Sequence, residues 1–383
     1  MGAKLTVRDE SFGLLRPLPP SVVIVGLLGC MTIVGVAAGL ARLFMGLGQT
    51  TALTDAYPWG IWIGFDFALI AFSGAGFTMA ALVHVLHFHR FAPALRPALL
   101  AGLLGYTAVL LLLVLDLGRP DRFYHFLLYW NGHSPLFEIS WCVLLYSTVL
   151  VIEVSPDVFG WLRWKKPARW ALLVMAPVTI IGVTLSTLHQ STLGTLYLMM
   201  PHRLDWLWYS PILPLLFFTS SVMAGLSLAI LAYRVAMRAQ GKAEQPSVIE
   251  GLAVGVVIAS AVYLTLRLGA LAWAGWQAQG AADAEMLRLL AAELTIGVLI
   301  PGLLLLVPAW RRMSAVQWLA PILVLAGVGM NRFNATLYAQ TPTVTGMTYE
   351  PHLFEWLSTF GILAGVALAW YLGVKFIMVE KRG

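Results

Sequence analysis

Long uninterrupted apolar runs fill the chain almost from end to end. Ten of these runs hold roughly 17 residues or more, close to the 20 or so that an α-helix needs to cross a hydrocarbon core about 30 Å thick. Their apolar residues are continuous and do not alternate with polar ones, as the strands of a transmembrane barrel do. The pattern predicts an all-α integral membrane protein with ten transmembrane helices. The runs cover residues 21–46, 58–86, 94–116, 134–154, 168–188, 209–233, 248–273, 287–310, 314–330 and 355–378.

The order of the runs suggests two four-helix bundles with two outer helices. We place the first bundle at 58–208 and the second at 209–354. The first helix and its loop occupy 21–57, the last helix and its tail occupy 355–383, and 1–20 form a short N-terminal segment. No repeated motif connects the two halves, so this division rests on helix order alone.

Basic residues are distributed unevenly over the loops between the runs. Of the 24 Lys and Arg residues, 17 fall at the two termini and in loops on one side, and Arg267 lies inside a run. The other six are Arg42, Arg119, Arg122, Arg203, Arg288 and Arg332. The positive-inside rule therefore places both termini in the cytoplasm. The formal charge of +6 follows this topology, and it does not indicate nucleic-acid binding, because only 11% of the residues are charged.

The loops on the opposite, periplasmic side are the more elaborate ones. They are rich in Trp, Tyr, His, Asn and Pro, and part of this aromatic content is typical of the interfacial belt of membrane proteins. Belt positions are expected at Trp59, Trp62, Trp206 and Trp208. Loops with so many polar and aromatic groups also favour docking of an extrinsic protein. The loops cover 47–57, 117–133, 189–208, 274–286 and 331–354.

Ionisable residues inside the runs gather in the outer half of the membrane. Such residues are costly in lipid and mark functional sites by default. Asp66 is expected about 10 Å deep, and Asp116 and His189 are expected to close their helices at the outer face. The others at this depth are Glu138, Arg267 and Glu293, whereas His84 and Glu153 lie near cytoplasmic ends.

Several of these residues also have a purely structural interpretation. Arg267 and Glu293 lie at similar depth and can form an ion pair between helices. Asp116 and Arg119, in LDLGRPDR, can brace a turn. Asp66 has no basic residue near it in sequence, which favours proton handling. His189 is followed by Gln190 and two hydroxyl residues, so it can bind a carbonyl oxygen or be a hydrogen-bonded interface histidine.

The sequence argues against a resident metal or haem. A b-type haem needs two axial histidines on facing helices at matching depth, and His84 and His189 lie at opposite ends of their helices. The two cysteines, Cys30 and Cys142, are isolated within runs and cannot hold an iron–sulfur cluster alone. No HExxH, Walker A or nucleophile-elbow motif is present in the sequence.

Four motifs resemble a known family. The runs YPWGIWIGFDF at 57–67, LDLGRPDRF at 115–123, STLHQSTLGTL at 186–196 and MNRFNATL at 330–337 are similar to NrfD-like proteins, the polysulfide-reductase membrane subunits. Within that family the ten-helix chain most resembles the integral membrane subunits of Hyb-type nickel–iron hydrogenases. The resemblance covers essentially the whole chain.

The resemblance implies a subunit in a bacterial inner membrane that passes electrons between a periplasmic iron–sulfur subunit and membrane quinone, menaquinone or ubiquinone. A catalytic subunit is expected beyond the iron–sulfur protein, and proton translocation can accompany the reaction. Asp66 and His189 are the expected catalytic residues. The expected quinone site consists of Tyr57, Trp59, Asp66, Glu138, His189 and Gln190. The expected proton path comprises Asp66, His84, Glu138, Arg267 and Glu293, and the docking residues are Arg119, Arg122, Arg203 and Arg332.

The rival interpretation is a secondary transporter or ion translocator. The same carboxylates would then bind protons or a solute, and broken helices with central Gly or Pro would support it. Pro177 and Pro301 lie within runs, but neither is next to a mid-membrane charge. Co-purification with an iron–sulfur protein and quinone favours the first interpretation, and solute-dependent stability of an isolated chain favours the second.

Reporter fusions test the orientation. Fusions after Gly241 and after Gly383 should report a cytoplasmic position, because the positively charged loops remain on that side. A fusion within 189–208 should report a periplasmic position. The opposite pattern would overturn both the orientation and the proposed docking face.

Overall fold

The computed structural model describes residues 20–200, 203–277, 283–340 and 349–378. Within these ranges ten helices are long and apolar enough to cross a membrane, and no β-strand is present, so the predicted all-α membrane class is confirmed. The spans are α1 (Pro20–Met45), α3 (Ile61–Ala80) with η1 (Ala81–Val85), η2 (His89–Phe91) with α4 (Ala92–Asp116), α6 (Pro135–Trp161), α7 (Lys165–Leu198), α8 (Leu213–Ala239), α9 (Pro246–Gln277), α10 (Ala284–Leu294) with η4 (Thr295–Leu299) and α11 (Ile300–Leu306), α13 (Ser314–Phe333) with η5 (Asn334–Tyr338), and α14 (Leu353–Leu372) with η6 (Gly373–Ile377).

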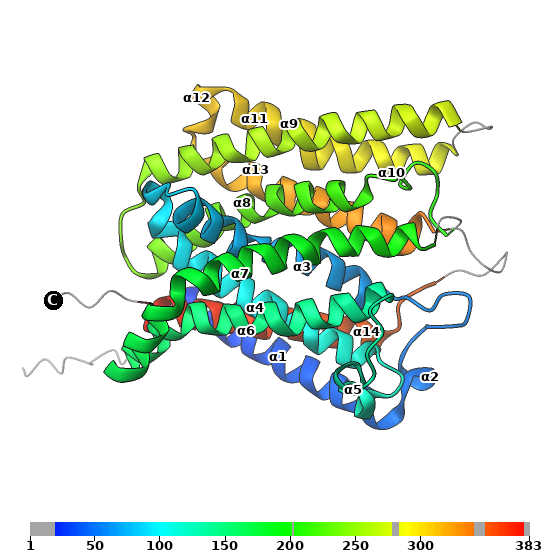
Figure 1. The fold of residues 1–383 in the computed structure, drawn as a ribbon, viewed down its shortest axis with the longest axis horizontal. Coiled ribbons are helices and arrows are strands. Elements are labelled where there is room, and N and C mark those ends of the chain that lie inside the picture. The colour runs from blue at the N-terminus through cyan, green and yellow to red at the C-terminus, as the bar shows by residue number, and fades with distance from the viewer. Residues whose placement is uncertain (1–19, 201–202, 278–282, 341–348, 379–383) are drawn as a thin grey trace, which may run out of the picture.

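The spanning helices lie side by side, with their connections at two opposite ends (Figure 1). One end carries the short helices α2 (Leu47–Thr50), η3 (Pro120–Arg122) and α5 (His125–Leu128). We call this the outer end, following the orientation predicted from the basic residues. The opposite, inner end carries α12 (Pro308–Arg311).

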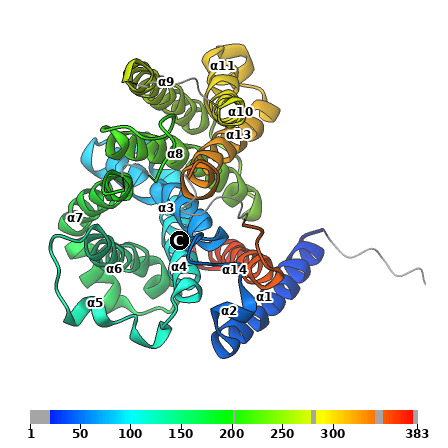
Figure 2. The same ribbon diagram turned by 90° about the vertical axis from the view of Figure 1, so that its right-hand side faces the viewer.

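Helix contacts define two rings and a pair. In the first ring α3 packs on α4, α4 on α6, α6 on α7, and α7 back on α3. In the second ring α8 packs on α9, α9 on α11, α11 on α13, and α13 back on α8. The first and last spans, α1 and α14, pack on each other beside α4 (Figure 2). The exact division of the chain into bundles at residues 58, 209 and 355 stays a prediction.

Glycine pairs allow the closest helix approaches. A Cβ atom on Gly225 of α8 would lie 2.7 Å from the carbonyl carbon of Gly74 on α3. A Cβ on Gly361 of α14 would overlap with the Cα of Gly35 on α1. Both approaches are possible only without a side chain, as is typical of helix packing in membranes. The first pair joins the two rings and the second joins the outer helices.

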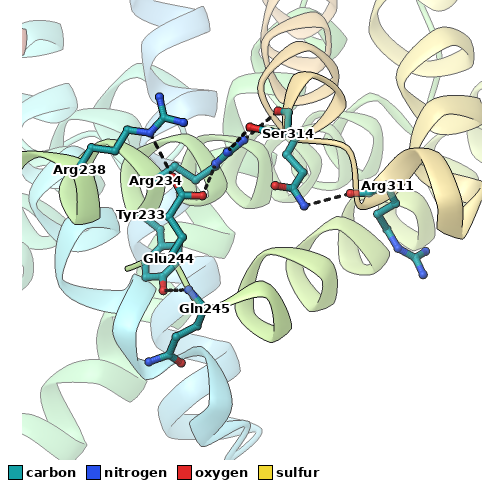
Figure 3. Close-up of polar contacts among 8 residues, drawn as sticks. Tyr233, Arg234, Arg238, Glu244, Gln245, Arg311 and Ser314 are labelled. Atoms are coloured by element: carbon teal, nitrogen blue, oxygen red, sulfur yellow. Dashed lines mark hydrogen bonds and ion pairs between the residues drawn. The ribbon is translucent and has the colours of Figure 1, made fainter. Parts of the chain in front are cut away.

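A cluster of charged and polar residues holds the inner end of the second ring (Figure 3). Arg234 Nε of α8 contacts Glu244 Oε2 at 2.9 Å, and its Nη2 donates to the Ser314 hydroxyl at 2.9 Å. Arg238 binds the other oxygen of Glu244 at 3.2 Å. The Tyr233 hydroxyl accepts from the backbone N–H of Gln245. These bonds tie the end of α8 to the α8–α9 loop and to the start of α13.

Two spans extend further toward the outer end than the apolar runs predicted. The run at 168–188 is part of α7, which continues to Leu198, and the run at 314–330 continues through η5 to Tyr338. His189 therefore does not close its helix but lies nine residues, or about 13 Å, before the end of α7. The predicted outer loops 189–208 and 331–354 are correspondingly shorter. Both extensions carry polar side chains, because these side chains face other helices and not lipid.

Candidate functional site

Polar aromatic side chains occupy the interior of the first ring. The ring centroids of His189 on α7 and Tyr106 on α4 lie 5.7 Å apart, and those of Tyr106 and Tyr146 on α6 lie 5.0 Å apart. All three side chains are almost completely buried. Among the described residues, neither nitrogen of His189 has a hydrogen-bond partner, whereas the hydroxyls of Tyr106 and Tyr146 both lie toward Ser186 of α7. Because an unpaired buried polar atom costs about 1–3 kcal/mol, the imidazole nitrogens suit a bound ligand.

Asp66 lies on α3 of the same ring, five residues after the helix begins. Its carboxylate is buried, and Oδ1 has no hydrogen-bond partner among the described residues. The charged group that acts on it is Asp116, at the end of α4, which in turn faces Arg42 of α1. Arg42 Nη2 donates to the carbonyl of Leu117 at 2.6 Å. Asp66 is therefore a buried acid next to a second acid, with one arginine nearby.

Gln190 connects the two helices that carry the predicted catalytic residues. Its side-chain Nε2 donates to the backbone carbonyl of Ile70 at 2.7 Å, one turn beyond Asp66 on α3. Gln190 directly follows His189 on α7, so this bond fixes the two helices at the depth of both residues. Gln190 Oε1 has no partner in the described part of the chain and is available as an acceptor.

Glu138 lies on the opposite side of the first ring, at the outer end of α6. It accepts a hydrogen bond from the Thr192 hydroxyl of α7 at 2.7 Å. Thr192 lies three residues after His189, so Glu138 is close in the fold to the predicted histidine. Trp59 packs edge-on against Tyr197 of α7 and contacts Phe67 of α3. The predicted residues Trp59 and Glu138 thus both contact α7 at the outer end.

A second group of bonds, which sequence reasoning missed, closes the outer end next to Asp66. Glu355 at the start of α14 accepts from the Tyr349 hydroxyl and from the backbone N–H of Ala52 at 3.0 Å. The Tyr349 hydroxyl also accepts from the N–H of Ile61, the first residue of α3. Burial and the hydrogen bond to Glu355 raise the pKa of the Tyr349 phenol. Tyr57 stacks on Tyr349, which places this predicted residue at the same closure.

An apolar crevice runs along α3 next to this site. Its outer part has a volume of about 710 Å³ and is lined by Phe65, Leu69 and Phe72 of α3 together with residues of α13 and α14. A second apolar pocket of about 310 Å³ shares the lining residues Leu69, Phe72 and Leu363 and lies between α4, α8 and α14. Phe65 immediately precedes Asp66. The crevice thus has the size and chemistry to accept a long hydrocarbon chain.

Glu293 is the centre of a buried polar cluster in the second ring. The ion pair expected between Arg267 and Glu293 is confirmed, with Nη2 and Oε1 3.5 Å apart. Glu293 also accepts from Trp208 Nε1 at 3.1 Å, and Asn331 and Asn334 donate to it at 3.1 and 2.9 Å. Trp208 was expected in the interfacial belt, but it is buried in this cluster. The cluster fills the interior of the second ring.

The remaining predicted residues lie apart from these two interiors. His84 is exposed in η1 at the inner end, whereas Glu153 is buried in α6 and accepts from the Thr179 hydroxyl at 2.9 Å. One interpretation had Asp116 and Arg119 brace a turn together, but within the described residues the charges that act on Asp116 are those of Arg42 and Glu355. Arg119 instead forms an exposed ion pair with Asp121, which raises the pKa of its guanidinium.

The four predicted docking arginines differ in how far they are exposed. Arg119 and Arg122 are exposed on the outer surface, and Arg203 is partly buried against Gln340. Arg332 is not available for docking, because it lies inside the second ring with 1% of its surface exposed. Its guanidinium donates to Asn331 Oδ1 at 2.7 Å and to the Ser220 hydroxyl at 2.8 Å. The prediction was wrong because η5 continues the span beyond the apolar run.

The described histidines do not fit a haem. His189 in the first ring packs against Tyr106, and His84 lies at the inner end near His87 and His89. No group of three or more metal-ligating side chains occurs in the described part of the chain. The expectation that this chain carries no haem or iron–sulfur cluster stays a prediction.

Fold and site together define a polytopic membrane protein with a buried acid and histidine in the outer half of one helix ring. Residues 49–343 match the family described as polysulphide reductase, NrfD. The chain therefore belongs to the NrfD family.

Three relatives are similar over most of their length. A protein of Nitratidesulfovibrio vulgaris is 33% identical over 85% of this chain and 86% of its own. The probable Ni/Fe-hydrogenase 2 b-type cytochrome subunit of Escherichia coli is 29% identical over 88% of this chain and 87% of its own. The integral membrane subunit of menaquinone reductase from N. vulgaris is 28% identical over 90% of this chain and 88% of its own.

Proposed function

We propose that this chain is the quinone-reactive membrane subunit of a respiratory oxidoreductase complex. The observation that carries the proposal is the pair Asp66 and His189, which are buried in one helix ring with polar atoms that no described residue binds. Similarity to subunits named for menaquinone reductase and Ni/Fe-hydrogenase supports it. The proposed location is a bacterial inner membrane, with both termini in the cytoplasm.

Quinone reduction and oxidation require hydrogen-bond partners for the two carbonyls and a group that exchanges protons. Reduction to quinol takes up two electrons and two protons, and oxidation releases them. The electrons pass between the quinone and an iron–sulfur cluster of a partner subunit, so this chain has to bind the ring and exchange the protons. We assign His189 as the hydrogen-bond partner of one carbonyl and Asp66 as the acid that exchanges a proton at the other. Gln190 and Tyr57 are secondary hydrogen-bond partners, and Trp59 packs on the ring.

The apolar crevice supports the same assignment. A membrane quinone carries a long prenyl chain, which needs an apolar path that opens next to the site of the ring. The crevice is lined by Phe65 and Leu69, which share one face of α3 and flank the turn that carries Asp66. We propose that the prenyl chain lies in this crevice.

A separate proposal concerns the path by which protons reach the quinone. Glu138, bonded to Thr192, is placed to connect the site with the outer surface. Toward the inner end, the hydroxyls of Tyr106 and Tyr146 are followed by Glu153, and His84 lies exposed at the inner surface. We propose that protons reach the quinone through these groups of the first ring. Translocation across the whole membrane would use the same series.

The transporter alternative draws on one observation. The π-helical segments η4 and η5 begin next to Glu293 and Arg332, so helix irregularities do occur beside buried charges in the second ring. Four donors already bind Glu293, however, including Arg267. A carboxylate bound in this way is poorly suited to load and release a proton. We therefore assign Arg267 and Glu293 to structure and favour the quinone function.

The partner is proposed to dock at the outer end. The segment around α5 exposes several large aromatic residues, among them Tyr129 and Trp130, next to the arginines 119 and 122. Exposed aromatic patches with flanking arginines are typical of protein interfaces. We propose that a periplasmic iron–sulfur subunit binds here and connects the chain to a catalytic subunit.

The variant Asp66→Asn tests the acid. Asparagine keeps the size of the side chain but cannot exchange a proton, so the complex should assemble while quinone-linked electron transfer falls by at least about 100-fold. The control is Asp157→Asn, the same change at the inner end, which should leave turnover near normal. Turnover close to wild type in Asp66→Asn would remove this residue from the mechanism.

The variant His189→Ala tests the carbonyl contact. Loss of a buried hydrogen bond of about 1–3 kcal/mol should weaken binding of a quinone-site inhibitor roughly 5- to 150-fold. Ser191→Ala is the matched control, because among the described residues the Ser191 hydroxyl bonds only carbonyls of its own helix. Equal inhibitor affinity in both variants would contradict the role of His189.

Photo-crosslinking tests the docking face. A photoreactive residue at Trp130, which is 71% exposed at the outer end, should form an adduct with the iron–sulfur subunit in the assembled complex. The same residue at Trp164, 54% exposed at the inner end, should not. Adducts at Trp164 alone would place the partner on the cytoplasmic face.

A further inference from the structure

The corner between α6 and α7, at the inner end, carries an exposed cluster of basic and aromatic side chains (Figure 1). Its sequence, WLRWKKPARW at 161–170, holds four basic residues and three tryptophans, and no acidic residue occurs between Asp157 and Asp205. All seven of these side chains are exposed. None of the four basic residues forms an ion pair within the described part of the chain. The corner therefore presents four positive charges that the described residues do not balance.

The exposed face of α7 follows the layers of a membrane interface. Lys166, Arg169 and Trp170 are spaced three and four residues apart, so they share this face, and Leu173 lies one turn further along it. Both basic residues lie within about 6 Å of Trp170 along the helix axis. Trp170 is 70% exposed and Leu173 is 72% exposed, and the exposed apolar face continues to Ile180. The order basic, aromatic, aliphatic matches the order of headgroup, interface and hydrocarbon in a lipid leaflet.

Arg163 occupies a position of the corner that usually takes glycine. Its φ of 61° lies in the left-handed region, which is unfavourable for a residue with a Cβ atom. The N–H of Arg163 donates to the carbonyl of Gly160, and the N–H of Trp164 donates to that of Phe159, so α6 ends in a Schellman motif. The rings of Phe159 and Trp164 stack 6.0 Å apart across this motif. The motif therefore holds a charged residue, at a cost in backbone strain, directly before the start of α7.

We propose that this corner binds one anionic phospholipid, whose phosphate is held by Arg163, Lys166 and Arg169 and whose acyl chain lies along Leu173. Guanidinium and ammonium groups are strong hydrogen-bond donors to phosphate oxygens. A soluble acidic partner fits this surface poorly, because the apolar face directly beyond Trp170 requires a hydrocarbon neighbour. α6 and α7 lie at the edge of the molecule, where lipid can reach them (Figure 2). The site is separate from the proposed quinone site and does not depend on it.

Native mass spectrometry of the purified full-length protein in detergent tests the site. Dioleoyl phosphatidylglycerol and dioleoyl phosphatidylcholine are titrated separately, so that only the headgroup differs. Wild type should bind the first phosphatidylglycerol at least about tenfold more tightly, because each basic residue near an anionic headgroup contributes roughly fivefold in affinity. Inorganic phosphate at the same ionic strength should not displace the lipid, because it has no acyl chain. Displacement by phosphate would contradict a lipid site.

Two variants and a charge-matched control locate the site. Arg169→Gln should weaken phosphatidylglycerol binding roughly fivefold and leave phosphatidylcholine binding unchanged. Arg163→Gly should weaken it to a similar degree while the melting temperature stays close to wild type, because glycine adopts a φ of 61° without strain. Arg312→Gln removes an exposed arginine that already pairs with Glu250 at 3.4 Å, so it should bind lipid like wild type. Equal affinity of wild type for the two lipids, or an unchanged preference in both Arg169→Gln and Arg163→Gly, would overturn the proposal.

Discussion

A polar group inside a hydrocarbon layer has to form its hydrogen bonds within the protein, because no water is present to serve as a partner. This constraint shapes both helix rings, and the two rings meet it in different ways. In the second ring Glu293 is bound by Arg267, Trp208, Asn331 and Asn334, so its carboxylate is fully used by the fold. In the first ring Asp66 and His189 are buried to the same degree but keep polar atoms without a partner among the described residues. We infer that the first ring is where a substrate completes the bonding.

The same constraint explains which helix ends hydropathy could locate. The pattern located ten spans because lipid-facing segments must be apolar, and the described part of the chain contains ten such helices. It ended the fifth span at 188 and the ninth at 330, where the runs HQST and NRFN begin. Both helices continue, because those polar residues face other helices and not lipid. Arg332 was placed in an outer loop for this reason, although it is buried. Trp208 was placed in the interfacial belt, but its connection between α7 and α8 buries it against Glu293.

The candidate site could be predicted only in part. Asp66 stands out in sequence because a lone acid among phenylalanines has no local structural partner, and the LHQSTLG motif draws attention to His189. The neighbours of these residues come from distant segments and carry no local signal. Tyr106 and Tyr146 are ordinary aromatic residues of apolar runs. The Glu355–Tyr349 contact joins the start of α14 to the start of α3, nearly 300 residues apart in the chain.

Labelling with a photoreactive quinone analogue tests the central proposal most directly. The analogue would be activated in the assembled complex, and the modified peptides identified by mass spectrometry. Labels are expected on α3 around Asp66 and on α7 around His189, and excess natural quinone should suppress them. Labels confined to the helices around Glu293, or labelling that natural quinone does not suppress, would contradict a quinone site in the first ring.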